Sequence, residues 1–229
     1  MTMCALAAGG KECKVKMKKY LLNLRNEPKN ETGYIKRFIA YGIDWYLGSF
    51  LSSLPLIMLY MSLHDDATFI PQVLFIFEAP YQIIAGLLTL SVAVFYYVII
   101  PAYIYKGQTL GKKLLGLKIV NDDYEDVSVK QIFIRQVVMI LIVEGSIYTA
   151  SNMLHQLLSV LINYNITTIC NYVGIAISLI SAIMVLFLKS KKALHDVVSH
   201  TLVVDVKSNQ YAFQIKKNKK LRKKELKLS

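Results

Sequence analysis

The chain has 229 residues, 55% of them hydrophobic, and a mean hydropathy of +0.42. This composition is too apolar for an ordinary soluble domain and is typical of a membrane protein with several spans. The net charge of +12 would suggest nucleic-acid binding in a soluble chain, but here the positions of the charges have to be considered first. Three cysteines, Cys4, Cys13 and Cys170, have no CxxC spacing, so we expect neither a disulfide framework nor a zinc site.

The N-terminal segment, residues 1–33, is basic and carries no recognisable secretory signal peptide. Its apolar piece, MCALAAGG, is short and precedes the basic residues instead of following them. Codons for Gly10-Lys11-Glu12 can spell a ribosome-binding site, so translation from Met17 is a hypothesis alongside translation from Met1. We expect this segment to be cytoplasmic.

Four stretches are long and apolar enough to cross a membrane as helices. A helix needs about 20 residues to cross about 30 Å of hydrocarbon. The predicted spans are residues 38–61, 81–104, 132–149 and 169–188, within a transmembrane domain that covers residues 34–206. The sequence therefore predicts an all-α membrane protein with four transmembrane helices.

The lysines and arginines indicate which side each connection faces. Nine of the 27 lie at or before Arg37, five lie between residues 106 and 130, Arg135 begins the third span, and twelve lie from Lys189 onward. The connections 62–80 and 150–168 contain none. Because cationic loops stay in the cytoplasm, four spans with both termini in the cytoplasm fit the pattern without a violation. The Lys-, Ile- and Asn-rich composition favours a bacterial cell membrane.

Two further segments have a predicted place at the membrane. The connection 150–168 repeats apolar residues at positions 154, 157, 158 and 161, which is helical spacing, so we expect a short helix lying on the outer interface. The polybasic tail, residues 207–229, is expected to touch anionic lipids of the bilayer. No aromatic residues are interleaved with its last cations, so nucleic acid is not an expected partner.

Charged residues inside the predicted spans are the first candidates for a site. Asp44 lies about 9 Å into the first span, where an ionised carboxylate costs about 2.5–3.5 kcal/mol and therefore needs a partner. Arg135, at the inner end of the third span, is the predicted partner, whereas Arg37 is expected to reach the headgroups. Glu144 follows Arg135 by nine residues, so on a straight α-helix the two point in opposite directions and Glu144 has no assigned partner. Two interpretations stay open: an ion or proton path, and a network that pins the helices together.

The cytoplasmic connections carry two short strand candidates, LKIVN at residues 117–121 and TLVVDV at residues 201–206. They could pair into a small two-stranded ribbon that caps the bundle. Ser128 is a plausible N-cap of the helix that follows the first candidate. The segment GQTLGKK is not a phosphate-binding loop, because its spacing is GxxxGK instead of GxxxxGK[ST].

Three ordered segments, YIKRFIAYGIDW, GQTLGKKLLGLKIV and ALHDVVSHTLVV, resemble the RDD family of membrane proteins, which is named for an arginine and two aspartates. By this resemblance the three name-giving residues fall on Arg37, Asp44 and Asp196. The residues that match the family's central loop motif are Gly107, Thr109, Gly111, Lys112 and Gly116. The resemblance implies a multi-span membrane protein; cation/proton antiport has been attributed to some members, and others resemble accessory subunits of membrane complexes.

Two functions follow as alternatives. One is transport of a small ligand or monovalent cation, with buried carboxylates that exchange it for protons; four helices are few for such a path, so a homo-oligomer is expected. The other is a non-transporting accessory or scaffold subunit with a membrane-protein partner. In both, Asp196 is predicted to anchor the loop through Lys112 or Lys113. No nucleophile and base have suitable spacing, so we expect no enzyme, no cofactor and no metal.

Overall fold

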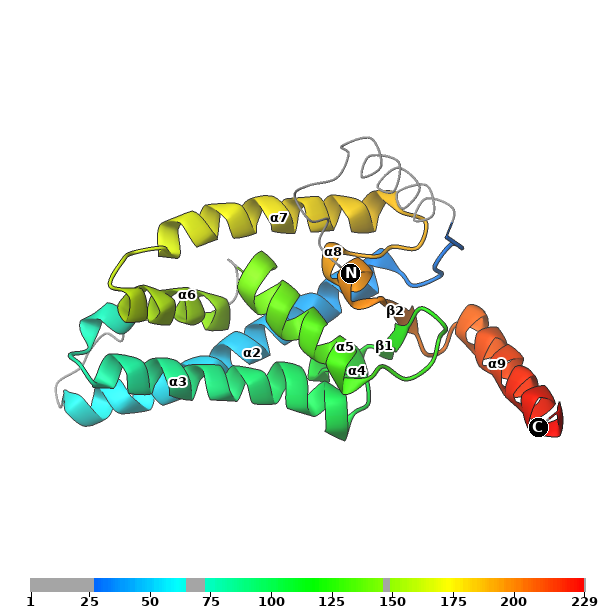
Figure 1. The fold of residues 1–229 in the computed structure, drawn as a ribbon, viewed down its shortest axis with the longest axis horizontal. Coiled ribbons are helices and arrows are strands. Elements are labelled where there is room, and N and C mark those ends of the chain that lie inside the picture. Colours follow the sequence, from blue (N-terminus) through cyan, green and yellow to red (C-terminus); the bar gives the residue numbers. More distant parts are fainter. Residues whose placement is uncertain (1–26, 65–72, 146–148, 229) are drawn as a thin grey trace.

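The computed structural model describes residues 27–64, 73–145 and 149–228, and Figure 1 shows their arrangement. The long helices are α2 (Tyr34–Leu63), α3 (Tyr81–Val94) with its π-helical continuation η2 (Phe95–Ile104), α6 (Thr149–Ile162), α7 (Thr167–Phe187) and α9 (Asn209–Leu228). Shorter elements are η1 (Leu74–Ile76), α4 (Leu110–Leu114), β1 (Leu117–Asn121), α5 (Val129–Phe133) with its π-helical continuation η3 (Ile134–Glu144), α8 (Leu194–Ser199) and β2 (Thr201–Asp205). The hypothesis about Met17 lies outside the described residues.

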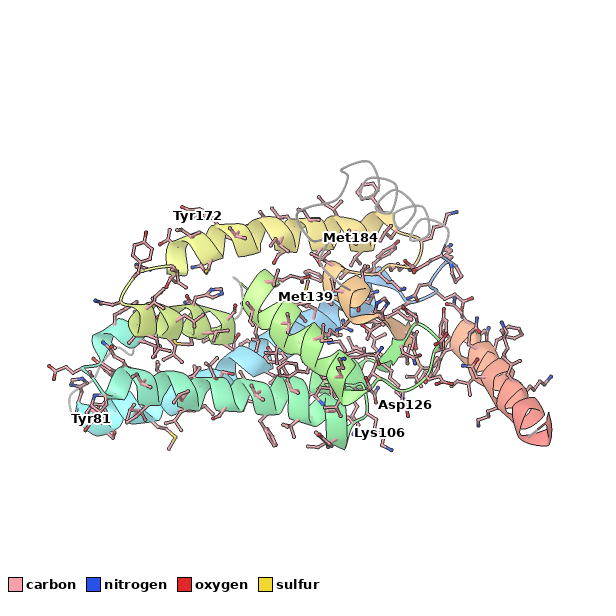
Figure 2. The ribbon with its side chains drawn as sticks, in the orientation of Figure 1. Tyr81, Lys106, Asp126, Met139, Tyr172 and Met184 are labelled. Atoms are coloured by element: carbon pink, nitrogen blue, oxygen red, sulfur yellow. The ribbon has the colours of Figure 1, made fainter. Side chains whose placement is uncertain are left out.

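Three of the predicted spans are single helices in the structure. In the described residues, the helices long and apolar enough to cross a membrane are Tyr34–Leu63, Tyr81–Ile104 and Thr167–Phe187. Tyr81 and Lys106 mark the two ends of the second of these in Figure 2. These helices agree with the predicted first, second and fourth spans within a few residues. The chain is thus mostly helical, as predicted.

The third predicted span, 132–149, differs from the prediction. The helix Val129–Glu144 ends before residue 149, and it meets α6 at an angle of 67°. Together these two helices are apolar and long enough to form a fourth, bent span. The sequence did not reveal the bend, because the apolar run continues through it.

Helix α6 occupies the segment predicted to lie on the outer interface, but it packs within the bundle. Figure 1 shows α6 running beside α3 and α7, and Met153 and Leu157 lie in the core with Leu56 and Ala85. The buried face of α6 also carries polar side chains, namely Ser151, His155, Gln156 and Ser159. Of the apolar residues used for the prediction, Leu157 is buried in this core, whereas Leu158 and Leu161 are 37% and 61% exposed. The buried polar side chains fit a helix of a membrane protein, because polar groups in lipid have to find partners inside the protein.

The bundle packs through small residues and aromatic rings. A first core cluster joins Tyr96, Tyr97 and Ile100 of η2 to Ile140 and Leu141 of η3. Gly48 of α2 makes room for the Tyr97 ring, since a Cβ at this position would lie 2.0 Å from the Tyr97 hydroxyl oxygen. Such close helix contact is a main source of stability in lipid, which offers little hydrophobic driving force between helices.

The predicted ribbon is present at one end of the bundle, here called the ribbon end. β1 and β2 pair antiparallel, from Leu117 opposite Asp205 to Asn121 opposite Thr201. Ser128 caps α5 as predicted: its hydroxyl accepts a hydrogen bond from the Gln131 backbone N–H, which forms a capping box. α9 begins on the ribbon, where Tyr211 packs against it, and then projects away from the bundle (Figure 1).

Candidate functional site

Asp44 is the centre of one polar cluster, and it is buried (2% exposed). Its Oδ1 accepts hydrogen bonds from the Gly111 backbone N–H at 2.8 Å and the Tyr96 hydroxyl at 3.1 Å. Its Oδ2 accepts from the Lys112 ammonium at 2.8 Å and from the Thr109 hydroxyl. The predicted partner, Arg135, is not among these groups. Both carboxylate oxygens are therefore satisfied by the GQTLGKK loop and η2.

The glycines of this loop explain how it reaches Asp44. At Gly111 an added Cβ would lie 2.5 Å from the Ala40 carbonyl oxygen and 2.9 Å from Asp44 Oδ1, so only glycine allows this approach. Gly107 and Gly116 have φ angles of +88° and +66°, a backbone region that side chains disfavour. The loop residues identified by resemblance thus pack against α2 at Asp44. Thr109 and Lys112 of the same loop also contact the Asp44 carboxylate.

Asp196 is the centre of a second cluster and is fully buried. Its Oδ1 lies 2.9 Å from Arg135 and its Oδ2 lies 3.2 Å from Arg37, while the Ala193 backbone N–H donates to Oδ2 at 3.0 Å. Burial alone raises the pKa of Asp196, but attraction to Arg135, His195 and Arg37 outweighs burial and holds the pKa well below its usual range. The carboxylate is thus held ionised between two arginines.

The predicted partners of Asp196 were wrong. Neither Lys112 nor Lys113 contacts it: Lys112 binds Asp44, and the Lys113 ammonium lies over the Tyr105 ring at 3.4 Å. The Arg37 side chain, which was expected to reach the headgroups, contacts Asp196 and donates to the Lys191 carbonyl. A buried carboxylate with two arginines is more stable than one with none, but which helices supply them is decided by the packing of α2, η3 and α8.

Glu144, which had no predicted partner, binds His195. Its Oε2 lies 2.8 Å from His195 Nδ1, and its Oε1 accepts from the His195 backbone N–H at 3.1 Å and the Ser181 hydroxyl at 3.2 Å. Glu144 and Arg135 thus both face α8, although a straight α-helix would separate them. The reason is that η3 is a π-helix with more residues per turn, so nine residues come close to two complete turns.

The Asp196 cluster and the Glu144–His195 pair meet on α8. His195 Nε2 lies 3.9 Å from Asp196 Oδ2, so Arg37, Arg135, Asp196, Glu144 and His195 form one polar centre. The sequence missed His195 because adjacent residues on a helix usually point in different directions. Asp44 and Lys112 form a separate cluster, which the GQTLGKK loop and η2 supply with donors and which α8 does not reach.

The structure offers no ready site for a metal within its described residues, because no group of three His, Cys, Asp or Glu lies together there. A groove of about 500 Å³ is lined by apolar residues of α2 and α3 and by Ser62: Leu51, Leu54, Pro55, Met58, Leu59, Leu88 and Val92. None of the charged residues above lines it. The contacts of these charged groups connect the helices α2, η3 and α8 and the GQTLGKK loop.

The comparison with known families agrees with the resemblance seen in the sequence. The chain belongs to the RDD family, whose model matches residues 32–200. No curated protein and no solved structure gives a significant match. Together with its long apolar helices, the family identifies the chain as an integral membrane protein.

Proposed function

We propose that this integral membrane protein is a non-transporting accessory subunit that binds another membrane protein in a bacterial cell membrane. One observation carries the proposal: the Asp44 and Asp196 carboxylates are saturated by donors from their own chain. A transported cation would have to displace Lys112 or an arginine. The buried charges then set the shape of the protein, and its outer surface binds the partner.

We also propose that the chain crosses the membrane four times with both termini in the cytoplasm, so that the ribbon end faces the cytoplasm. Basic residues concentrate in the connections at that end, in agreement with the positive-inside rule. Reporter fusions test it: a reporter near Asn163 is expected outside and one after Lys207 inside. The same side for both would reject the orientation.

Purification after gentle solubilisation tests the accessory function. A membrane-protein partner at fixed stoichiometry is expected, and Asp44→Asn should weaken its retention if the loop has to be in place. A chain that purifies alone, or as a homo-oligomer, and transports cations after reconstitution would overturn the proposal.

Cation/proton exchange is the second candidate, favoured by the Glu144–His195 contact of 2.8 Å. In the described residues Glu144 has no arginine or lysine partner, and the side chain it contacts, an imidazole, is a common proton carrier. Exchange would then couple a proton on this pair to a cation on Glu144, within a homo-oligomer.

Flux into proteoliposomes tests the exchange. Glu144→Gln is expected to abolish pH-driven cation uptake, and Asp205→Asn, a change at an aspartate outside the bundle, is the matched control. No uptake of sodium or potassium by the wild type rejects exchange of those ions, and unchanged uptake by Glu144→Gln rejects Glu144 as the coupling site.

A further inference from the structure

Two segments far apart in the sequence lie against each other where α2 begins and α7 ends. The Asn30 backbone N–H donates to the Lys189 carbonyl at 2.9 Å, and the Asn30 side chain donates to the Ser190 carbonyl at 3.3 Å. The Lys191 ammonium donates to the Thr32 carbonyl. Figure 1 shows the segment before α2 beside the chain that leaves α7. These bonds bring together two exposed lysines, Lys29 and Lys189.

Lys191, between these two segments, is buried without a carboxylate. It is 6% exposed, and in the described part of the chain its ammonium forms no salt bridge; its other neighbour is the Tyr34 ring at 4.1 Å. Its neighbour in sequence, Lys192, contacts both Glu27 and Asp122 at 2.8 Å. Buried charges are normally paired, but the described residues supply no carboxylate to the Lys191 ammonium.

Other cations lie near Lys191 and repel its charge. Burial, together with the nearby charges of Arg37 and Lys29, lowers the pKa of Lys191. The Asp196 carboxylate does not offset these charges, because it is shared between Arg37 and Arg135. The Ser190 hydroxyl is also buried, and it has no hydrogen-bond partner among the described residues.

The corner lies where a charged headgroup and apolar chains would meet. Directly beside it, the ends of α7 and α2 present large apolar side chains, Phe187, Ile35 and Phe38, which are 82%, 75% and 77% exposed. An amphiphile with a negative headgroup therefore matches both parts of this surface.

We propose that this corner is a binding site for an anionic phospholipid, with the phosphate held by Lys29 and Lys189 over the charge of Lys191 and the acyl chains against Phe187, Ile35 and Phe38. The first turn of the polybasic helix α9 contacts this corner, since the Gln210 side chain donates to the Lys29 carbonyl at 2.8 Å. The remaining length of α9 projects away from the bundle (Figure 1). The lipid would tie the start of α2 to the end of α7.

Native mass spectrometry of the full chain in detergent, titrated with phosphatidylglycerol or phosphatidylcholine, tests the proposal. Wild type is expected to retain one phosphatidylglycerol in preference to phosphatidylcholine. The double variant K29Q/K189Q is expected to bind it about tenfold more weakly. The control K216Q/K217Q removes the same charge from two exposed lysines of α9 and is expected to bind like wild type.

Equal loss of lipid in both double variants would overturn the proposal, because it would show attraction to net charge alone. Equal retention of both lipids by wild type would overturn it as well. Inorganic phosphate is the third arm: if it competes with the lipid at millimolar concentration, the corner binds free phosphate and the lipid assignment is wrong. Unchanged melting temperatures of the two variants in lipid-free detergent confirm that the fold is intact.

Discussion

Asp44 and Asp196 are both buried aspartates at the ribbon end, but their partners differ in kind. Asp44 has one cation, Lys112, and neutral donors from a loop and a tyrosine. Asp196 has two arginines, Arg37 and Arg135, which come from different helices. Asp44 therefore positions a loop, whereas Asp196 neutralises two cations that the bundle cannot release to water.

This difference sets the cost of losing each carboxylate. Without Asp196, two arginines whose side chains are 12% and 3% exposed would lack their shared counter-charge. Without the charge of Asp44, one lysine with a side chain 15% exposed is left, and its long stem can carry the ammonium toward water. The comparison thus predicts a hierarchy of effects.

The largest effect is expected for Asp196→Ala. Removing one partner of a buried ion pair costs about 3–5 kcal/mol, so the free energy of unfolding should fall by about that amount. Denaturation in mixed micelles measures it. The control is Asp205→Ala, which loses a contact to the half-exposed Lys36 and should cost less than about 1 kcal/mol. Equal losses would mean that burial does not distinguish the two sites.

Asp44→Asn is expected to lower the free energy of unfolding by less, about 1–3 kcal/mol, because the amide leaves buried donors without an acceptor. A double-mutant cycle with Lys112→Gln separates the ion pair from the neutral contacts and should give a coupling of about 0.5–3 kcal/mol. A coupling near zero would show that Lys112 contributes nothing and that the neutral donors alone hold Asp44.

Gly111→Ala tests the loop without touching a charge. Its Cβ would meet the Ala40 carbonyl oxygen at 2.5 Å, so the loop has to move, at a cost of about 1–3 kcal/mol. Gly42→Ala on the same helix as Ala40 is the matched control, because nothing lies within 4 Å of the added Cβ. That control should stabilise the protein by up to about 1 kcal/mol through helix propensity. Destabilisation by both would contradict the close approach seen at Gly111.

The smallest effect is expected when the pH is lowered from 7 to 5, a range in which the melting temperature should change little. Because the pKa of Asp196 is lower in the folded protein, its stabilisation is complete above its usual value near 4 and is lost as the pH falls below it. Melting temperatures between pH 3 and pH 7 should show an acid loss that is reduced in Asp196→Asn. If wild type instead loses its stability near pH 6, a group other than Asp196 controls the acid dependence.

The pattern of the sequence was sufficient for the helices and the ribbon. Apolar runs of about 20 residues form helices in lipid, so three long apolar helices were predicted within a few residues. LKIVN and TLVVDV paired as predicted, because β-branched strands at one end of a bundle bury their edges by pairing. The N-cap role of Ser128 was predictable for the same reason, because it depends on Gln131, three residues further along the chain.

The partners of the charges were not predictable in this way. Arg135 was paired with Asp44 from its apparent depth and Glu144 was left alone from α-helical geometry, and both inferences failed where η3 becomes a π-helix. α6 was predicted to lie on the outer interface from its apolar spacing alone. Its packing in the core through Met153 and Leu157 depends on residues far away in the sequence, such as Leu56 and Ala85.

By itself, the sequence determined the family, the long apolar helices, the ribbon strands and the residues that carry charge, because each depends on composition or on neighbours along the chain. The tertiary structure alone decided that Asp44 holds the GQTLGKK loop, that Asp196 joins Arg37 to Arg135, and that Glu144 meets His195. These contacts depend on the winding and bend of η3 and on close packing at Gly111, and such geometry arises only when the helices are assembled.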